Sequence, residues 1–569
     1  MAIGLARRSG EYSFLKILAH GTIWIGSLWA GCPDTSAETY HVAQKSAQAA
    51  DTNPGTEAAP WKTFTKAAAE LGPGDTAVIH EGIYREWVNP ARSGSASAPI
   101  VFQAAAGESV VLTGADIVSG WVRGEGHVWK KESWQHRFAT HPNDDRHRLV
   151  GRCEQLIVDG QLLKQVERVE DVAAGTFCAD TDKQVLYVWL AGDEDPNGHV
   201  VEAAVRGICF GPGWGREPRH HIVLRGITIR HAANMAQRGA LFAAGDGWLV
   251  EDCVVEWTNG SGISFRGDDV TFRRVCSRHN GQQGLGGGGR RFCLEEVTLD
   301  HNNVKGFDQD WEAGGTKIAL SRDGIVRRCR AIANTGVGIW FDIDVRDVLV
   351  EECFAQDNAG HGIFVEISGG FTVRNNLCVR NGTEDRWGSG GIALGESDHC
   401  TIENNTCVLN PTGISLREQG PRTCRNVDGG QATYHVHDVV VRRNICALNS
   451  RYQVGLWWDN SFFGAHPSAS RGALGTPYDP GQNNIRFDQN LFWTADQQAL
   501  ALWGCPWRPK HKKYADLTAW QQEQAQDQQS LAADPQFFSP ANGDWRLRPE
   551  SPARQLSAGS SLDGQVAQP

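Results

Sequence analysis

The chain has 569 residues, a formal net charge of −11, 65 glycines and 21 tryptophans, and it contains no long basic run. This acidic balance lacks the electrostatic footprint of a nucleic-acid-binding protein, so no nucleic-acid partner is expected. The length allows either several domains or one repetitive unit, because a solenoid grows by stacking coils that contact only their neighbours.

The first 37 residues have the order of a secretory signal peptide. Two arginines and a lysine precede an apolar run over residues 17–30. This run is too short, and too interrupted by histidine and glycine, for a membrane span. We therefore expect export to the periplasm or beyond, with cleavage after Ala37. A lipid anchor at Cys32 is one alternative, and a misplaced start codon on a cytoplasmic protein is another.

Residues 38–118 are predicted to form an N-terminal cap and the first coils of a solenoid. Apolar residues at helical spacing predict a short helix over 60–71, which would cover the open end of the sheets. The stretches 74–79 and 99–102 have the pattern of the first strands.

The repeat is lost over 119–206, where strand-like segments such as 155–160 and 185–189 alternate with turn signals. We interpret this stretch as an inserted β-rich subdomain. The main solenoid is expected over 207–460, followed by a C-terminal tail, 461–569, that packs on it.

A Gly-apolar pattern recurs through the main solenoid at a core period of 22 to 24 residues, with longer gaps in places. Such a period with occasional insertions predicts an all-β protein built as a parallel β-helix. Asn-rich turns at 375–376 and 404–405 suit left-handed backbone angles and stacked amides. The aligned starts are Gly262, Gly284, Gly306, Gly338, Gly362, Gly391, Gly413 and Gly455.

Six of the fifteen cysteines recur at fixed points of the repeat. Recurrence at one point predicts an inward stack of small, weakly polar side chains. Disulfides or a metal site are the alternatives, and the lack of a CxxC pair disfavours them. The recurring positions are Cys253, Cys329, Cys353, Cys378, Cys407 and Cys446.

Two neighbouring coils carry a carboxylate at the same position. Asp342 is fifth in the segment 338–343, and Glu366 is fifth in 362–367. One coil apart, they would lie on adjacent parallel strands about 4.8 Å apart. Carboxyl groups roughly 5 to 5.5 Å apart have the nucleophile and acid/base spacing of a retaining glycosidase. The period therefore predicts an active site.

The same alignment adds Asp310 to this column and places Asp344 outward as well. Three stacked acids repel one another, so at least one carboxyl is expected to have a raised pKa. Glycines on either side would leave room for a ligand. The full column is Arg266, Gly288, Asp310, Asp342, Glu366, Gly395, Arg417 and Asp459.

Trp340 and Phe364 occupy the neighbouring column, where they would stack on a sugar or form an outward ladder that only stabilises the coils. The segment 307–317 offers two glycines for close backbone approach, together with several polar groups. It would bind sugar hydroxyls, hold Ca²⁺, or form a solvated acidic turn. Its polar groups are Asp308, Asp310, Glu312 and Lys317.

Taken together, these motifs resemble the right-handed β-helix glycosidases of glycoside hydrolase family 120, which is known for β-xylosidases. The resemblance rests on 60–63, 82–86, the inserted β region, 311–317, 338–342 and 364–366, and it covers most of the chain. It implies a right-handed parallel β-helix in which Asp342 is similar to the nucleophile and Glu366 to the acid/base. Trp311, Glu312, Lys317 and Trp340 would line the pocket. No cofactor would be required, and any Ca²⁺ would be structural.

The leading hypothesis is a retaining, exo-acting glycoside hydrolase for plant or algal polysaccharide fragments. A Ca²⁺-dependent lyase on uronic-acid glycans is the first alternative, with Asp308, Asp310 and Asp342 as metal ligands and Lys317 or Arg417 as the base. The second alternative is a non-catalytic glycan-binding surface solenoid, in which the acids form a solvated face.

Overall fold

The computed structural model describes residues 37–141, 149–385, 388–458, 478–494, 498–504 and 512–561. Almost all of the predicted signal peptide, with the lipid anchor proposed at Cys32, and Asp459 of the predicted column lie outside the described residues. No helix within the described ranges is long and apolar enough to cross a membrane.

Three long sheets form the body of the protein, because most coils contribute one strand to each sheet. The first sheet is parallel throughout. Its order is β1 (Thr39–Val42), β2 (Thr76–Ile79), β4 (Ile100–Ala104), β15 (Ile222–Arg225), β18 (Leu249–Glu251), β21 (Thr271–Arg273), β24 (Cys293–Glu295), β27 (Ile325–Arg327), β30 (Leu349–Glu351), β33 (Thr372–Arg374), β36 (Asp398–Glu403), β41 (His437–Arg442) and β44 (Ile485–Asp488).

The second sheet is formed in the same way by the strand that follows in each coil, after the next bend of the chain. Its order is β3 (Gly82–Tyr84), β5 (Val110–Thr113), β16 (Ile227–Arg230), β19 (Val254–Glu256), β22 (Cys276–Arg278), β25 (Thr298–Asp300), β28 (Arg330–Ile332), β31 (Phe354–Gln356), β34 (Leu377–Val379), β37 (Thr406–Val408), β42 (Ile445–Ala447), β45 (Leu491–Trp493) and β48 (Leu531–Ala532).

The third sheet carries the predicted carboxylate pair. Its last strand pairs antiparallel, and the others pair parallel. The order is β17 (Gly239–Ala244), β20 (Ser261–Arg266), β23 (Gln283–Gly288), β26 (Gly314–Arg322), β29 (Val337–Arg346), β32 (Ile363–Glu366), β35 (Gly390–Gly395), β38 (Thr412–Glu418), β43 (Tyr452–Trp458), β46 (Ala499–Trp503) and β47 (Lys512–Tyr514).

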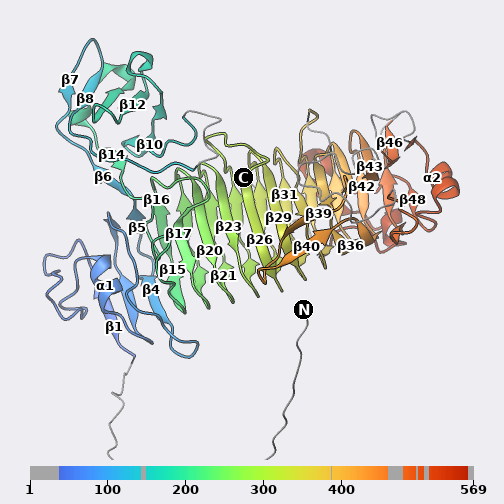
Figure 1. Cartoon of the computed structure of the whole chain (residues 1–569), viewed down its shortest axis with the longest axis horizontal. Coiled ribbons are helices and arrows are strands. Elements are labelled where there is room, and N and C mark those ends of the chain that lie inside the picture. The colour runs from blue at the N-terminus through green and yellow to red at the C-terminus, as the bar shows by residue number, and fades with distance from the viewer. Residues whose placement is uncertain are drawn as a thin grey trace, which may run out of the picture. The chain divides into compact units, whose positions relative to one another are not determined.

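These sheets confirm the predicted parallel β-helix. Figure 1 shows consecutive coils side by side from β15 to β31. The parallel pairing continues through β44, β45 and β46, beyond the stretch in which the sequence shows its repeat. One apolar cluster runs inside the coils from Val42 to Trp520, as expected when each coil buries its inward side chains against its neighbours.

The segment between β5 and β15 forms two further sheets. A four-stranded sheet has the order β10 (Gln161–Leu162), β9 (Leu156–Val158), β14 (Val201–Ala204) and β6 (Ala115–Ile117). A five-stranded sheet has the order β11 (Lys164–Gln165), β12 (Thr176–Asp180), β13 (Val185–Trp189), β8 (Trp129–Lys131) and β7 (Val122–Arg123). Trp121, Leu156 and Phe177 belong to a separate apolar cluster, so this inserted subdomain has its own core.

Helices and short hairpins complete the fold. Helix α1 (Phe64–Glu70) begins after Thr63, whose hydroxyl accepts from the Lys66 amide, and buries Phe64 in the core. Helix α2 (Leu517–Gln524) buries Trp520. Two hairpins are β39 (Arg422–Arg425) with β40 (Gln431–Tyr434), and β49 (Phe537–Ser539) with β50 (Asp544–Leu547). Short 3-10 helices cover Val169–Asp171, Ala191–Asp193, Pro196–Gly198, Pro540–Asn542 and Pro552–Arg554.

Stacked side chains hold the turns of successive coils. Cys378, Cys407 and Cys446 pair in register, and all three are buried free thiols, as predicted. The predicted asparagine stack is also present: the Asn376 amide donates to Asn405 Oδ1 at 2.9 Å, and the Asn405 amide donates to Asn444 Oδ1 at 3.0 Å.

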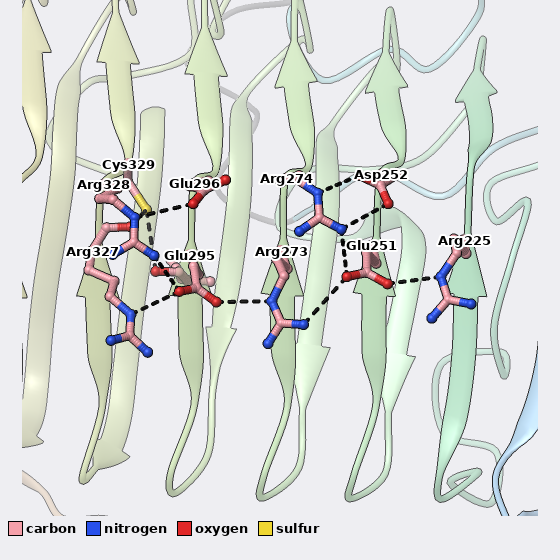
Figure 2. Close-up of polar contacts among 11 residues, drawn as sticks. Arg225, Glu251, Asp252, Arg273, Arg274, Glu295, Glu296, Arg327, Arg328 and Cys329 are labelled. Atoms are coloured by element: carbon pink, nitrogen blue, oxygen red, sulfur yellow. Dashed lines mark hydrogen bonds and ion pairs between the residues drawn. The ribbon is translucent and has the colours of Figure 1, made fainter. Parts of the chain in front are cut away.

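A ladder of alternating charge runs along the first sheet, one residue per strand (Figure 2). Glu251 binds Arg225 at 2.8 Å and Arg273 at 3.4 Å, and Arg273 in turn binds Glu295 at 2.9 Å. The register continues the alternation with opposite charges on facing strands. The remaining members are Arg327, Glu351, Arg374, Glu403, Arg442 and Asp488.

Candidate active site

Asp342 on β29 and Glu366 on β32 lie side by side on adjacent parallel strands, as the period predicts. The paired register of the two strands ends with Phe341 facing Val365, one residue before the two acids. Both carboxyl side chains are buried, with residue exposures of 6% and 9%. A strand spacing of about 4.8 Å brings the two carboxyl groups within direct electrostatic reach of each other.

A bulge follows Asp342 directly. The register between β26 and β29 shifts after Ala319, and Ile343 and Asp344 have φ of 63° and 54°. These left-handed angles end the strand alternation, and Asp344, predicted as a further outward acid, does not face solvent. Its buried carboxylate instead accepts hydrogen bonds from the Tyr434 hydroxyl and from the Val427 amide.

Lys317 is the cation beside Asp342. Its Nζ lies 2.8 Å from Oδ2 of Asp342 and 3.7 Å from Oε1 of Glu312, and 4.1 Å from the centre of the Trp340 ring. Burial and the neighbouring Glu366 raise the pKa of Asp342 to about 6, although Lys317 opposes both effects. Lys317 therefore keeps Asp342 mainly ionised at neutral pH.

Two arginines hold Glu366. Its Oε1 lies 3.0 Å from Nη2 of Arg417 and 2.6 Å from Nη1 of Arg422. The same two nitrogens lie 3.2 and 3.4 Å from the fully buried Glu396. Burial alone would raise the pKa of Glu366, but the two guanidinium groups outweigh burial and lower it.

Arg422 reaches the site from the β39–β40 hairpin, which leaves the coil after β38. Glu418 closes the base of this hairpin by accepting the Gly420 amide at 2.7 Å and the Val436 amide at 2.6 Å. Burial raises the pKa of Glu418 to about 8. Arg422 and Glu396 were not predicted, because neither lies at an aligned position of the coils. Arg417 was predicted as a member of the column and as a candidate lyase base.

The predicted column of three acids is wrong. The register places Ala319, and not Asp310, beside Asp342, and it places Trp457 beside Arg417. The Gly306 start lies in a loop before β26, so the aligned strand of that coil begins eight residues later. Asp310 is exposed in this loop.

The other predicted pocket residues lie in two places. Glu312 and Lys317 reach Asp342, whereas the Trp311 ring packs 4.8 Å from the His141 ring. Trp340 and Phe364 stack on each other with ring centroids 5.8 Å apart, and both are nearly buried. They therefore form the aromatic ladder that was one of the two predicted alternatives. A hollow beside Phe364 is lined by His361, Ala393, Ser415, Arg417 and Trp457.

Two buried polar atoms at the pair lack a hydrogen-bond partner among the described residues: Oδ1 of Asp342 and Nε1 of Trp340. One is an acceptor and the other is a donor, and they belong to side chains two residues apart on one face of β29. A ligand with hydroxyl groups would satisfy both atoms.

The structure also brings together a group of side chains of the types that bind metals. One ligand atom each from Asp398, His399 and His437 lies within 4.8 Å of the others. Calcium prefers oxygen ligands, whereas imidazole suits transition metals better. This group therefore does not match a structural Ca²⁺ of the kind that the resemblance to family 120 allows. Asp308 Oδ1 accepts the Asp310 amide within its own loop.

Comparisons with known proteins agree with the fold. A family model described as the right handed beta helix region matches residues 238–407. No curated protein matches the sequence. The complex of XylC with xylose has a TM-score of 0.59 at 19% identity, covering 83% of this chain and 87% of that chain. A structure named glycoside hydrolase has a TM-score of 0.41 at 13% identity, covering 82% and 96%. The chain is an all-β protein of the right-handed parallel β-helix class.

Proposed function

We propose that the protein is an exported retaining glycoside hydrolase that removes sugars from the ends of plant or algal polysaccharide fragments. The observation that carries the proposal is the buried pair of Asp342 and Glu366 on adjacent strands, each with its own cationic partners. The fold shared with XylC, which was solved with xylose, and the resemblance to family 120 favour a β-xyloside as the first substrate to test.

The first chemical step forms a covalent intermediate. Glu366 donates its proton to the glycosidic oxygen, while the Asp342 carboxylate attacks the anomeric carbon. The bond from the anomeric carbon to the leaving oxygen breaks, and an ester bond to Asp342 forms. Lys317, at 2.8 Å, keeps Asp342 ionised before attack.

The second step returns the enzyme to its starting state. The Glu366 carboxylate takes a proton from water, whose oxygen attacks the anomeric carbon and displaces Asp342. The product keeps the configuration of the substrate, because the anomeric carbon is inverted twice.

The charges around the pair place one requirement on this assignment. In this structure the pKa of Asp342 is raised and that of Glu366 is lowered, so Asp342 takes up a proton first as the pH falls. Glu366 acts as the acid only if bound substrate reverses this order. Separation of one guanidinium, most simply that of Arg422 on its hairpin, from the Glu366 carboxylate would do so.

Azide rescue tests both the reaction class and the two roles. The variants Asp342→Ala and Glu366→Ala should each lose at least about 100-fold in kcat on an aryl β-xyloside. Azide should then give the inverted glycosyl azide with Asp342→Ala and the retained one with Glu366→Ala. If Asp342→Ala instead gave the retained azide and Glu366→Ala the inverted one, Glu366 would be the nucleophile and Asp342 the acid/base. Full activity in either variant would refute the catalytic pair, and binding without turnover across aryl glycosides would favour the non-catalytic solenoid.

The site disfavours a Ca²⁺-dependent lyase. A cation bound at Asp342 would lie beside the Lys317 ammonium, which repels it. The register also removes Asp310 from the column that suggested a shared ligand set.

A further inference from the structure

We propose that the protein has a second glycan-binding site, a pocket between the inserted subdomain and the segments 207–214 and 233–238, which precede the third sheet. The pocket has a volume of about 460 Å³, within the range of roughly 300 to 1,000 Å³ typical of small-ligand sites. The segments 137–139, 205–208 and 233–235 line it, together with Trp87 and Trp214. The inference rests on the proposed function for the chemical class of the ligand, a glycan, and for the site at Asp342 that the end of this ligand would reach.

Trp214 provides a fixed aromatic surface in this pocket. Its ring stacks on Phe242 of β17 with centroids 4.0 Å apart and planes 9° apart. The guanidinium of Arg238 lies 5.3 Å from the centre of the same ring. Trp87 is held as firmly, because its Nε1 donates to the Gly211 carbonyl at 3.0 Å. Rigid indole rings bind ligands at a low cost in conformational entropy, and their faces suit the C–H groups of a sugar ring.

Two donors in the pocket walls are buried and have no hydrogen-bond partner among the residues that the structure describes: Nε1 of Trp214 and Nη1 of Arg206. Arg206 is anchored through its other terminal nitrogen, which binds Asp116 at 2.8 and 3.0 Å. Buried donors without acceptors are costly. An apolar ligand would leave both donors unsatisfied, whereas the hydroxyl and ring oxygens of a sugar would accept from them.

The pocket and the catalytic pair belong to one face of one sheet. The register places Phe242, under Trp214, in the column that continues through Ser264, Gly286, Lys317 and Trp340. Four strand steps separate Phe242 from Trp340, a distance of about 19 Å. An oligosaccharide of several residues spans this distance. The pocket would therefore bind the distal part of a substrate whose end reaches Asp342.

The turn that lines the pocket also contacts the loop leading to Lys317. Ala236 packs with Phe307 and Ala313 in one small buried cluster, and Trp311 packs against it. These contacts fix the pocket wall against the strand that carries Lys317. An oligosaccharide bound both in the pocket and at Asp342 would therefore meet a rigid surface between the two.

Direct binding tests the proposal without requiring turnover. An Asp342→Asn background would be titrated by calorimetry with xylo-, manno- and cello-hexasaccharides. Adding Trp214→Ala should raise the Kd of the best ligand roughly tenfold, by loss of the stacking surface and one donor. Trp214→Phe, which keeps a ring but loses the donor, should give a smaller increase.

Trp189→Ala is the matched control, because this half-buried tryptophan of the inserted subdomain stacks on His127 rather than lining the pocket. It should leave the Kd unchanged, and thermal melts should show that all variants fold. Equal Kd values for Trp214→Ala and its background, or no binding by any hexasaccharide, would overturn the second site. Binding that depends on Trp214 in a protein that hydrolyses no glycoside would retain it while refuting the proposed function.

Discussion

Lys317 and Asp342 form a buried ion pair, with Nζ 2.8 Å from Oδ2. The lysine stands one coil before the aspartate, on the strand that pairs with β29, and its ammonium also lies over the ring of Trp340. Lys317 thus contacts both Asp342 and Trp340, and all three residues were predicted for the site. It also sets the protonation of the proposed nucleophile.

Replacement of this lysine by methionine, Lys317→Met, should move the acidic limb of the pH profile of kcat to higher pH, because kcat reports the substrate complex, in which the proposed mechanism requires Asp342 to have the lower pKa of the two acids. Burial and Glu366 raise the pKa of Asp342, and only the cations oppose them. Without Lys317 the pKa rises further, and the ionised nucleophile is lost at a higher pH. The loss of activity should therefore be roughly tenfold or more at pH 5 and smaller at pH 8. Lys45→Met, which breaks an exposed pair with Glu81, is the control and should leave the profile unchanged.

The variant Arg422→Ala should move the acidic limb of the pH profile of kcat/KM to higher pH. That profile reports the free enzyme, in which Glu366 has the lower pKa of the two acids, and removal of Arg422 raises this pKa. An unchanged acidic limb would mean that Arg422 does not control the protonation of Glu366. Arg425→Ala, an exposed position on the same strand of the hairpin, should change neither limb.

The sequence predicted that Asp342 and Glu366 lie on adjacent strands because nothing interrupts the coil between them. The two segments share the Gly-Ile start, so the period places the acids in register without help from the rest of the fold. The preceding coil carries a long loop whose Gly306-Phe307 mimics this start. The true strand, from Gly314, contributes Lys317 and Ala319, so the aligned position beside Asp342 holds no acid.

Two other features of the structure differ in whether the sequence shows them: the charge ladder leaves a visible pattern, and Arg422 does not. The charge ladder is visible in the sequence as short strand segments that end alternately in Glu and Arg, such as 249–251 and 271–273, but it was not among the predictions. Arg422 could not be found in this way. Its hairpin has no counterpart in the described parts of the other coils, and it is placed by tertiary contacts such as that of the Val427 amide with Asp344.

The asparagine stack predicts a large effect from one small change. Asn405→Ala removes a buried amide that donates to Val373 and Asn444 and accepts from Asn376. Asn376 and Asn444 then lose hydrogen-bond partners in a site closed to water. The free energy of unfolding should therefore fall by about 2 to 4 kcal/mol, the sum of these two losses. Asn404→Gly is the control. Asn404 has a φ of 55°, which glycine adopts freely, so its thermal midpoint should stay near that of the wild type.

The charge ladder predicts a pH-dependent contribution to stability. Glu295 accepts hydrogen bonds from Arg273 and Arg328 and forms an ion pair with Arg327. Burial would raise its pKa, but these arginines outweigh burial and lower it. A carboxylate with a lowered folded-state pKa stabilises the protein above its unfolded value, about 4.3, and loses this effect as the pH falls through the folded value.

Glu295→Gln should therefore lower the thermal midpoint at pH 7, by an amount equivalent to about 1 kcal/mol, and much less at pH 3. The difference at pH 7 should shrink in 1 M NaCl, because salt screens these half-exposed pairs. Glu296→Gln, whose carboxylate is more exposed and meets Arg328 at 3.2 Å, should have a smaller effect. A Glu295→Gln midpoint that differs from the wild type equally at both pH values would mean that the ladder acts through packing and not through charge.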